Sequence, residues 1–182
     1  MKYLCVFCGS SKGEPAIYAE TARRFGEVMA ARRWGLVYGG GHIGLMGVLA
    51  DAVLRAGQPV LGVIPRSMVE RELAHEGLTE LHIVETMHQR KALMAERAAA
   101  FAALPGGVGT ADEFFEIVTW RQLRLHGKPI GLLNVAGFFD PLLAWLDRTV
   151  ADGFFRSEHR AFLHVAEEPE QLLDLLHQRL GE

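Results

Sequence analysis

Short apolar runs alternate with longer helix-like stretches along the whole chain. The runs are rich in β-branched and aromatic residues without strict polar alternation, which is typical of strands buried on both faces. This pattern predicts strands at 3–7, 36–38, 60–64, 81–84, 101–104, 129–133 and 162–165. It predicts helices at 15–33, 45–56, 87–99, 111–125, 141–151 and 169–180, and a less regular stretch at 66–80.

Strands that alternate with helices indicate βαβ units and a parallel sheet covered on both faces. Proline and glycine fit this interpretation, since Pro15 suits a first helical turn and Gly57 suits a helix end. No internal repeat, low-complexity tract or linker interrupts the pattern. We therefore expect residues 1–182 to form one α/β domain, a three-layer, doubly wound, Rossmann-like parallel sheet.

Composition narrows the class of protein. The 182 residues are 49% hydrophobic and carry a formal net charge of −3, so the basic footprint of a nucleic-acid-binding protein is missing. No apolar run reaches the roughly 18 residues of a membrane helix. The apolar run at the start breaks at Gly9 and is too brief for a signal peptide, so we expect a cytoplasmic protein with no membrane partner.

Two cysteines, Cys5 and Cys8, lie three residues apart in and just after the first expected strand. Residues at that spacing point to opposite faces of a strand. We expect two buried free thiols, with neither a disulfide nor a metal pair.

Polar or glycine-rich residues follow four of the expected strands. In an open parallel sheet, ligands bind beyond the carboxyl ends of the strands, where the strand order reverses. Convergence of these segments on one edge predicts a ligand site there. The segments are 8–11, 39–44, 86–91 and 105–110.

The turn from Gly106 to Thr110 is the sharpest of these features. Glycine lets a ligand approach the backbone, and the helix that follows presents unpaired N–H groups and its positive dipole end. The hydroxyl of Thr110 adds a further donor. These properties favour a phosphate, the alternative being a plain tight connection between strand and helix.

The second glycine-rich turn matches a dinucleotide fingerprint only in part. Gly39, Gly41 and Gly44 have G-x-G-x-x-G spacing, but they follow the second strand, and the next strand ends in Ile64-Pro65 without an acidic residue. No Gly-Lys-Ser/Thr follows, so the turn is not a Walker A loop. We therefore do not expect a whole dinucleotide to bind.

Charged residues cluster beside these turns. Glu113 lies close enough to the anion-binding turn to reach a sugar on the bound phosphate, and Glu116 shares its helix face. For Asp112 we favour a role in complementing the helix dipole. Arg90 and Lys91 open a helix where cations are unfavourable, which points to function. The alternative is a surface cluster paired with acidic neighbours.

Other residues near the same edge have less specific signals. Met87 and His88 either contact a flat base or only pack. The histidines at positions 42, 75, 82 and 126 show no metal-ligand spacing, so we expect no metal site.

Several segments of the chain resemble the LOG ("lonely guy") family. PGGVGTADE at 105–113 matches its PGGxGTxxE signature, and MHQRK at 87–91 matches its second signature element. CGSS at 8–11, GGGHIGLMG at 39–47 and the stretch 119–134 are also similar to family segments. The resemblance runs nearly end to end, with no departure at a signature position.

The resemblance implies a cytokinin riboside 5′-monophosphate phosphoribohydrolase. Such an enzyme cuts the N-glycosidic bond of an N6-substituted adenosine monophosphate, or of AMP, and releases the free base and ribose 5-phosphate. It also implies Arg90 and Glu113 as the catalytic pair, and a homodimer or higher homo-oligomer. We expect the nucleotide to be bound by Ser10, Gly41, Met87, Lys91, Gly106, Gly107, Gly109, Thr110 and Glu116.

Many family members carry the label lysine decarboxylase, and the sequence argues against that chemistry. It usually needs pyridoxal phosphate on a Schiff-base lysine. Of the four lysines only Lys91 falls at the predicted edge, so we expect no cofactor.

Two other functions remain open from the sequence. One is a nucleotide 5′-phosphatase or pyrophosphatase, which usually needs a divalent metal held by an acidic cluster. The other is a non-catalytic carrier of a nucleotide or of molybdenum cofactor, because some LOG-like folds are known as carriers.

Overall fold

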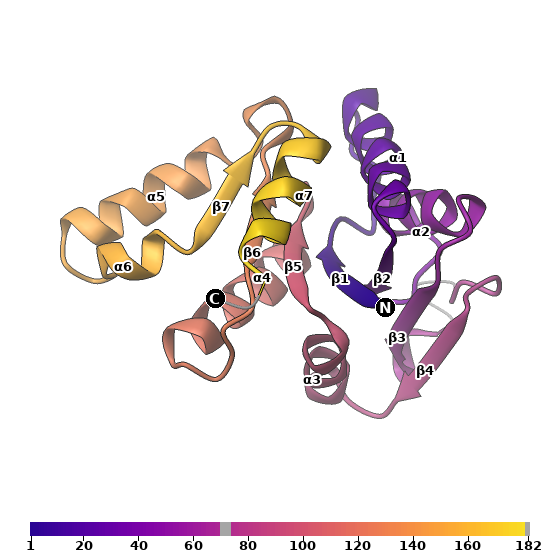
Figure 1. Ribbon diagram of the computed structural model, residues 1–182. Coiled ribbons are helices and arrows are strands. Elements are labelled where there is room, and N and C mark those ends of the chain that lie inside the picture. The colour runs from indigo at the N-terminus through magenta and orange to yellow at the C-terminus, as the bar shows by residue number, and fades with distance from the viewer. Residues whose placement is uncertain (70–73, 181–182) are drawn as a thin grey trace.

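A seven-stranded sheet forms the centre of the computed structural model, which describes residues 1–69 and 74–180 (Figure 1). The strand order is β4-β3-β2-β1-β5-β6-β7, and every pairing is parallel, which confirms the expected doubly wound α/β sheet. The strands are β1 (Lys2–Phe7), β2 (Trp34–Tyr38), β3 (Val60–Pro65), β4 (Glu80–Val84), β5 (Ala100–Ala103), β6 (Ile130–Leu133) and β7 (Leu163–Ala166).

Each expected helix is present, with ends that differ by a few residues. The helices are α1 (Ala16–Ala31), α2 (Gly44–Arg55), α3 (Met87–Arg97), α4 (Val108–Gln122), α5 (Asp140–Ala151) and α7 (Pro169–Gln178). The pattern missed the short helix α6 (Ser157–Arg160) and two 3₁₀ turns, η1 (Arg66–Met68) and η2 (Val135–Gly137). These pieces are too short for a helical period to show in the sequence.

Helices cover both faces of the sheet and enclose two hydrophobic cores. Leu4 and Val6 of β1 belong to the core formed with residues of α1, α2 and α7, whereas Cys5 and Phe7 belong to the core formed with residues of α3, α4 and α5. Alternate residues of a strand point to opposite faces, so a strand covered on both sides must be apolar throughout. This is why the inner strands β2, β3, β5 and β6 read as unbroken apolar runs, whereas the edge strands β4 and β7 each include a histidine.

The winding of the sheet reverses beside β1. The chain passes from β1 outward to the edge strand β4, and then α3 returns it to β5 on the other side of β1. The segments that leave β1, β2 and β5 therefore meet at one edge, as expected for a ligand site at a switch point.

Helix α4 begins at Val108, three residues earlier than the sequence pattern predicts. Gly107 is its N-cap, and the amide of Ala111 donates to the carbonyl oxygen of Gly107 at 3.1 Å. Gly109 and Thr110 therefore belong to the first helical turn and not to the loop. Glycine's poor helix propensity concealed this from the sequence pattern, yet the N–H groups of a first turn have no partner within the helix.

Within the described residues, no helix is both long enough and apolar enough to span a membrane.

Candidate active site

Three loops are hydrogen-bonded together at the switch point. The amide of Gly9, after β1, donates to the carbonyl oxygen of Pro105 at 3.1 Å. The carbonyl oxygen of Gly9 accepts from the amide of Leu45, at the start of α2, at 3.0 Å. The loop after β1 therefore ties the glycine-rich turns after β2 and β5 into one floor.

The glycines of the turn after β5 differ in what surrounds them. A Cβ on Gly106 would overlap Oγ1 of Thr110 and come within 2.8 Å of the amide nitrogen of Gly9. A Cβ on Gly107 or Gly109 would meet nothing within 4 Å. Gly106 is therefore needed for packing, whereas Gly107 and Gly109 face open space where a ligand can approach the backbone.

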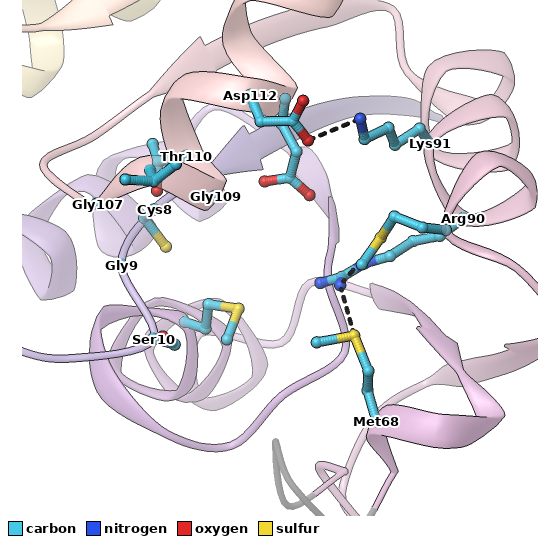
Figure 2. Close-up of a pocket in the computed structure, with 14 residues that line it drawn as sticks. Cys8, Gly9, Ser10, Met68, Arg90, Lys91, Gly107, Gly109, Thr110 and Asp112 are labelled. Atoms are coloured by element: carbon cyan, nitrogen blue, oxygen red, sulfur yellow. Dashed lines mark hydrogen bonds and ion pairs between the residues drawn. The ribbon is translucent and has the colours of Figure 1, made fainter.

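A pocket of about 260 Å³ opens above this floor. Eight of the expected site residues line it, namely Ser10, Met87, Arg90, Lys91, Gly107, Gly109, Thr110 and Glu113. Figure 2 shows Ser10, Cys8 and Thr110 on one side of the pocket and Arg90 and Lys91 on the other. The residues come from loops and helices far apart in sequence, and the switch point brings them together.

Three expected binding residues lie outside the lining of this pocket. Gly41 pairs with Ala74, and its carbonyl oxygen accepts from the hydroxyl of Tyr38 at 3.1 Å. Gly106 is packed as described above. Glu116 forms an ion pair with Lys91.

The first turn of α3 holds Arg90 in a buried position. A capping box starts the helix, in which the Thr86 hydroxyl accepts from the Gln89 amide and the Gln89 side chain accepts from the Thr86 amide. Arg90 is 4% exposed, and its Nη2 donates to the carbonyl oxygen of Gly39 at 3.2 Å. A buried guanidinium stays charged, so the pocket contains a fixed cation.

Two methionine sulfur atoms contact the Arg90 guanidinium. Nη1 of Arg90 lies 3.8 Å from Sδ of Met68 and 3.8 Å from Sδ of Met87. Figure 2 shows the Met68 contact, and Met46 also lines the pocket. Thioether side chains are flexible and polarizable, which suits contact with a flat aromatic base.

Lys91 is held by two carboxylates of α4. Its Nζ lies 2.7 Å from Oδ2 of Asp112 and 3.2 Å from Oε2 of Glu116. Burial alone would lower the pKa of Lys91, but the hydrogen bonds to the two carboxylates outweigh burial and raise it. Lys91 therefore joins α3 to α4 at the pocket edge. The first turn of α4 contains no acidic residue, so the expected dipole role of Asp112 is wrong, and its contact is the ion pair with Lys91.

Glu113 contributes negative charge to the same pocket. Burial raises the pKa of the Cys8 thiol, and the charge of Glu113 raises it further. The pKa of Cys5 is raised by burial and by Glu113, and is lowered in part by Arg90. Both cysteines are free and buried, as predicted, and Cys8 lines the pocket as a neutral thiol.

The sequence pattern missed two lining residues, Met46 and Met68. Cys8, Gly9 and Val108 line the pocket and lie in segments that the sequence does predict at this edge, although without a binding role, and for Asp112 the sequence favours only a dipole role. Met68 lies in the stretch without clear periodicity, so no local signal marked it. Met46 lies within GGGHIGLMG, where the motif was the only available clue.

A family model described as "possible lysine decarboxylase" matches residues 46–176. The cytokinin riboside 5′-monophosphate phosphoribohydrolase LOG2 of Arabidopsis thaliana is 49% identical over 173 residues, which cover 95% of this chain and 81% of that protein. The probable cytokinin riboside 5′-monophosphate phosphoribohydrolase LOGL2 of Oryza sativa subsp. japonica is 47% identical over 95% of this chain and 71% of its own length.

Solved structures also resemble the fold. A molybdenum cofactor carrier protein from Chlamydomonas reinhardtii has a TM-score of 0.75 at 20% identity, covering 98% of this chain and 97% of that chain. The molybdenum cofactor binding protein from Rippkaea orientalis has a TM-score of 0.73 at 17% identity, covering 97% and 96%. At this level of identity the likeness concerns the fold alone. The family model and the near-full-length likeness to the two plant proteins show that this chain belongs to the LOG family.

Proposed function

We propose that this chain hydrolyses the N-glycosidic bond of adenosine 5′-monophosphate and its N6-substituted forms. The products are the free base and ribose 5-phosphate. One observation carries the proposal: an open helix N-terminus, a carboxylate and a buried arginine line one pocket, contributed by 107–110, Glu113 and Arg90. The names of the plant relatives support the same reaction.

The 5′-phosphate binds at the first turn of α4 in this proposal. Amides of that turn have no partner within the helix, and the dipole favours an anion there. Gly107 and Gly109 leave the backbone accessible. The hydroxyls of Ser10 and Thr110, which line the same pocket, are positioned to donate to phosphate oxygens. A phosphate held at this turn positions the sugar that it carries.

Glu113 acts on the ribose. Cleavage of the C1′–N9 bond leaves positive charge on the sugar, which a nearby carboxylate stabilises. Glu113 also orients the attacking water and accepts its proton, while the water oxygen bonds to C1′. Glu113 lies one helical turn after the phosphate-binding turn, so a ribose attached to the phosphate comes within its reach.

Arg90 acts on the leaving base. The purine departs with the electron pair of the broken bond, and the fixed guanidinium offsets the negative charge that develops. Arginine is too weak an acid to protonate the base. A water molecule therefore relays to the purine nitrogen the proton that Glu113 accepted, which restores the carboxylate. Met46, Met68 and Met87 contact the face of the base.

The two alternatives fit the pocket less well. A phosphatase needs a cluster of metal ligands beside the phosphate, but Asp112 is engaged by Lys91. Among the described residues, His42, Asp51 and His75 form the trio of possible metal ligands, and none of them lines the pocket. A mere carrier has little need of a carboxylate beside a phosphate, and the likeness to molybdenum cofactor carriers is one of fold.

The proposal is tested by incubating the protein with AMP and with isopentenyladenosine monophosphate and identifying the products by chromatography. We expect free base and ribose 5-phosphate, with and without a chelator. Glu113→Gln and Arg90→Ala should each lower base release at least about a hundredfold while the protein stays folded. Glu27→Gln is the matched control, because Glu27 forms an exposed ion pair with Arg23 on α1. Release of inorganic phosphate, or normal turnover in either pocket variant, would refute the proposal.

We further propose that residues 1–182 act as one domain in a cytoplasmic homodimer. A groove of about 470 Å³ between α4 and α5 is the observation that supports a homodimer. Its lining includes Trp145 and Phe154, which are 55% and 84% exposed. Exposed aromatic side chains of this size are typical of protein interfaces.

A further inference from the structure

Two histidines and an aspartate lie together outside the pocket. His42 follows the glycines of the turn after β2, Asp51 lies on α2, and His75 lies in the segment before β4. One ligand atom from each of the three lies within 4.8 Å of the others. Their positions in the sequence gave no sign of this, because the fold and not the spacing brings them together.

A glycine on α2 allows His42 to approach Asp51. Gly47 and Asp51 are four residues apart and therefore share one face of the helix. A Cβ on Gly47 would overlap the carbonyl oxygen of His42. The backbone of His42 thus rests on the helix one turn before Asp51, and a ring nitrogen of His42 lies within 4.8 Å of a carboxylate oxygen of Asp51.

The third member is fixed by backbone pairing. Ala74 pairs with Gly41 in an antiparallel bridge, and the amide of His75 donates to the carbonyl oxygen of Gly40 at 3.0 Å. The His75 ring is 7% exposed, and its Nε2 lies 2.9 Å from Oδ1 of Asp51. Its ring centroid lies 4.6 Å from that of His42. Two of the three donors are therefore held in place before any ligand arrives.

We propose that His42, Asp51 and His75 bind a divalent transition-metal ion of the Zn²⁺ class. Two imidazole nitrogens and one carboxylate oxygen are a donor set that suits Zn²⁺, with water in the fourth position. The exposed ring of His42 leaves a path for the ion and its water. None of the three residues lines the pocket, so this site is separate from the proposed hydrolysis.

Metal binding requires one local rearrangement. The amide of Gly77 donates to Nδ1 of His75 at 3.0 Å, so the neutral ring carries its proton on Nε2, facing Asp51. A ring that binds a metal through Nε2 must carry the proton on Nδ1 instead. The Gly77 hydrogen bond must then open. Glu76 and Gly77 form an exposed turn, so water can replace the lost partner of the Gly77 amide.

The experiment titrates tag-free, metal-free protein with Zn²⁺ by calorimetry at neutral pH. We expect one ion per chain, with affinity at least about tenfold weaker in His42→Ala and in Asp51→Asn. His42 is exposed, so its variant tests the ligand without disturbing the core. His82→Ala is the matched control, because His82 pairs with a carboxylate, Glu80, at 3.1 Å, but is not in the trio.

Nuclear magnetic resonance supplies a second readout. Zn²⁺ should shift the Gly77 amide and speed its hydrogen exchange in the wild type, and in His42→Ala it should do so only at a Zn²⁺ concentration that is at least about tenfold higher. Absence of stoichiometric binding, or equal affinity in the wild type and both ligand variants, would overturn the proposal. A Gly77 amide that stays protected with Zn²⁺ bound would overturn the assignment of His75 Nε2 as a ligand.

Discussion

Nη2 of Arg90 occupies the space that a side chain at position 39 would fill, 3.2 Å from the carbonyl oxygen of Gly39. A Cβ on Gly39 would overlap that nitrogen and come within 3.4 Å of Sδ of Met46. The first glycine after β2 is therefore needed to seat the arginine, and not to approach a phosphate.

Gly39→Ala should displace Arg90 and lower kcat/KM for AMP at least about a hundredfold, as expected for loss of a charge that acts on the transition state. Steady-state kinetics of Gly39→Ala, Arg90→Ala and the double variant form the test. Because both changes remove the same guanidinium, the double variant should be no slower than the worse single variant. Fully multiplicative losses would show that Gly39 acts independently of Arg90.

Gly109→Ala should weaken substrate binding without weakening the fold. The added methyl meets no protein atom and lies on a helix, so unfolding free energy should stay equal or rise by up to about 1 kcal/mol. The same methyl would obstruct the bound phosphate, so KM for AMP should rise about tenfold or more. Thermal unfolding and kinetics measure the two effects.

Gly106→Ala is the contrasting control for that prediction. Its methyl would overlap Thr110 and crowd Gly9, so the melting temperature itself should fall. An unchanged KM in Gly109→Ala would argue against phosphate binding at this turn.

Lys91→Met should destabilise the contact between α3 and α4. Asp112 and Glu116 would lie together without their shared cation, so like-charge repulsion should lower the melting temperature at pH 8. A drop of about 2–4 °C corresponds to roughly 1 kcal/mol for a chain of this size. Adding Glu116→Gln to Lys91→Met should recover part of the loss, and no recovery would rule out repulsion as the cause.

The stability of the fold should fall as pH drops below neutrality because of His126. Its Nε2 donates to the carbonyl oxygen of Ile117 and its Nδ1 accepts from the Lys128 amide, so the neutral ring satisfies both contacts. Burial lowers the pKa of His126 below its usual value, and the nearby charges of Arg121 and Lys128 lower it further. The hydrogen bond to Ile117 acts in the other direction and raises this pKa, but it does not outweigh burial. The unfolded chain thus takes up this proton more readily.

The stabilising contribution of His126 is therefore complete above about pH 6.5, the ordinary value, and is lost as pH falls through the lower folded-state pKa. Denaturant unfolding between pH 7.5 and pH 5 should show a shallower pH dependence in His126→Gln than in the wild type. His82→Ala, on the exposed edge strand β4, should keep the wild-type slope. Identical slopes in all three proteins would exclude His126 as the source.

The groove between α4 and α5 should control the oligomeric state. Phe154→Glu or Trp145→Glu places a charge on the exposed aromatic surface and should convert a dimer into a monomer in light scattering. Lys2→Glu, a charge change at the exposed start of β1, is the control. A dimer that persists in both groove variants would place the interface elsewhere.

The sequence predicts the fold well because its strongest signals are local. Buried strands require continuous apolar runs, and glycine or proline marks their ends, so each strand and each long helix is visible in one stretch of chain. The site is less predictable where it depends on packing. Asp112 acquires its role only because α3 and α4 lie side by side, and Met68 only because η1 reaches the pocket.

Two glycines show that a motif can also predict a ligand contact where the fold instead uses the glycine for packing. Gly41 and Gly106 belong to motifs that predict ligand contact, yet one pairs with Ala74 and the other packs on Gly9. A motif records that glycine is required and not which neighbour requires it. The grouping of His42 with Asp51 and His75 also depends on the tertiary fold alone.

The residues that build the pocket are divided between the part of the chain before the crossover from the edge strand β4 to β5 and the part from the crossover onward. Arg90 lies on α3, within the crossover, and Glu113 follows it, whereas Gly9 and Gly39, which support the floor and seat the arginine, precede it. Neither half alone can enclose a nucleotide. A gene cut between Val84 and Met87 should therefore give two inactive fragments that regain turnover only by reassembling.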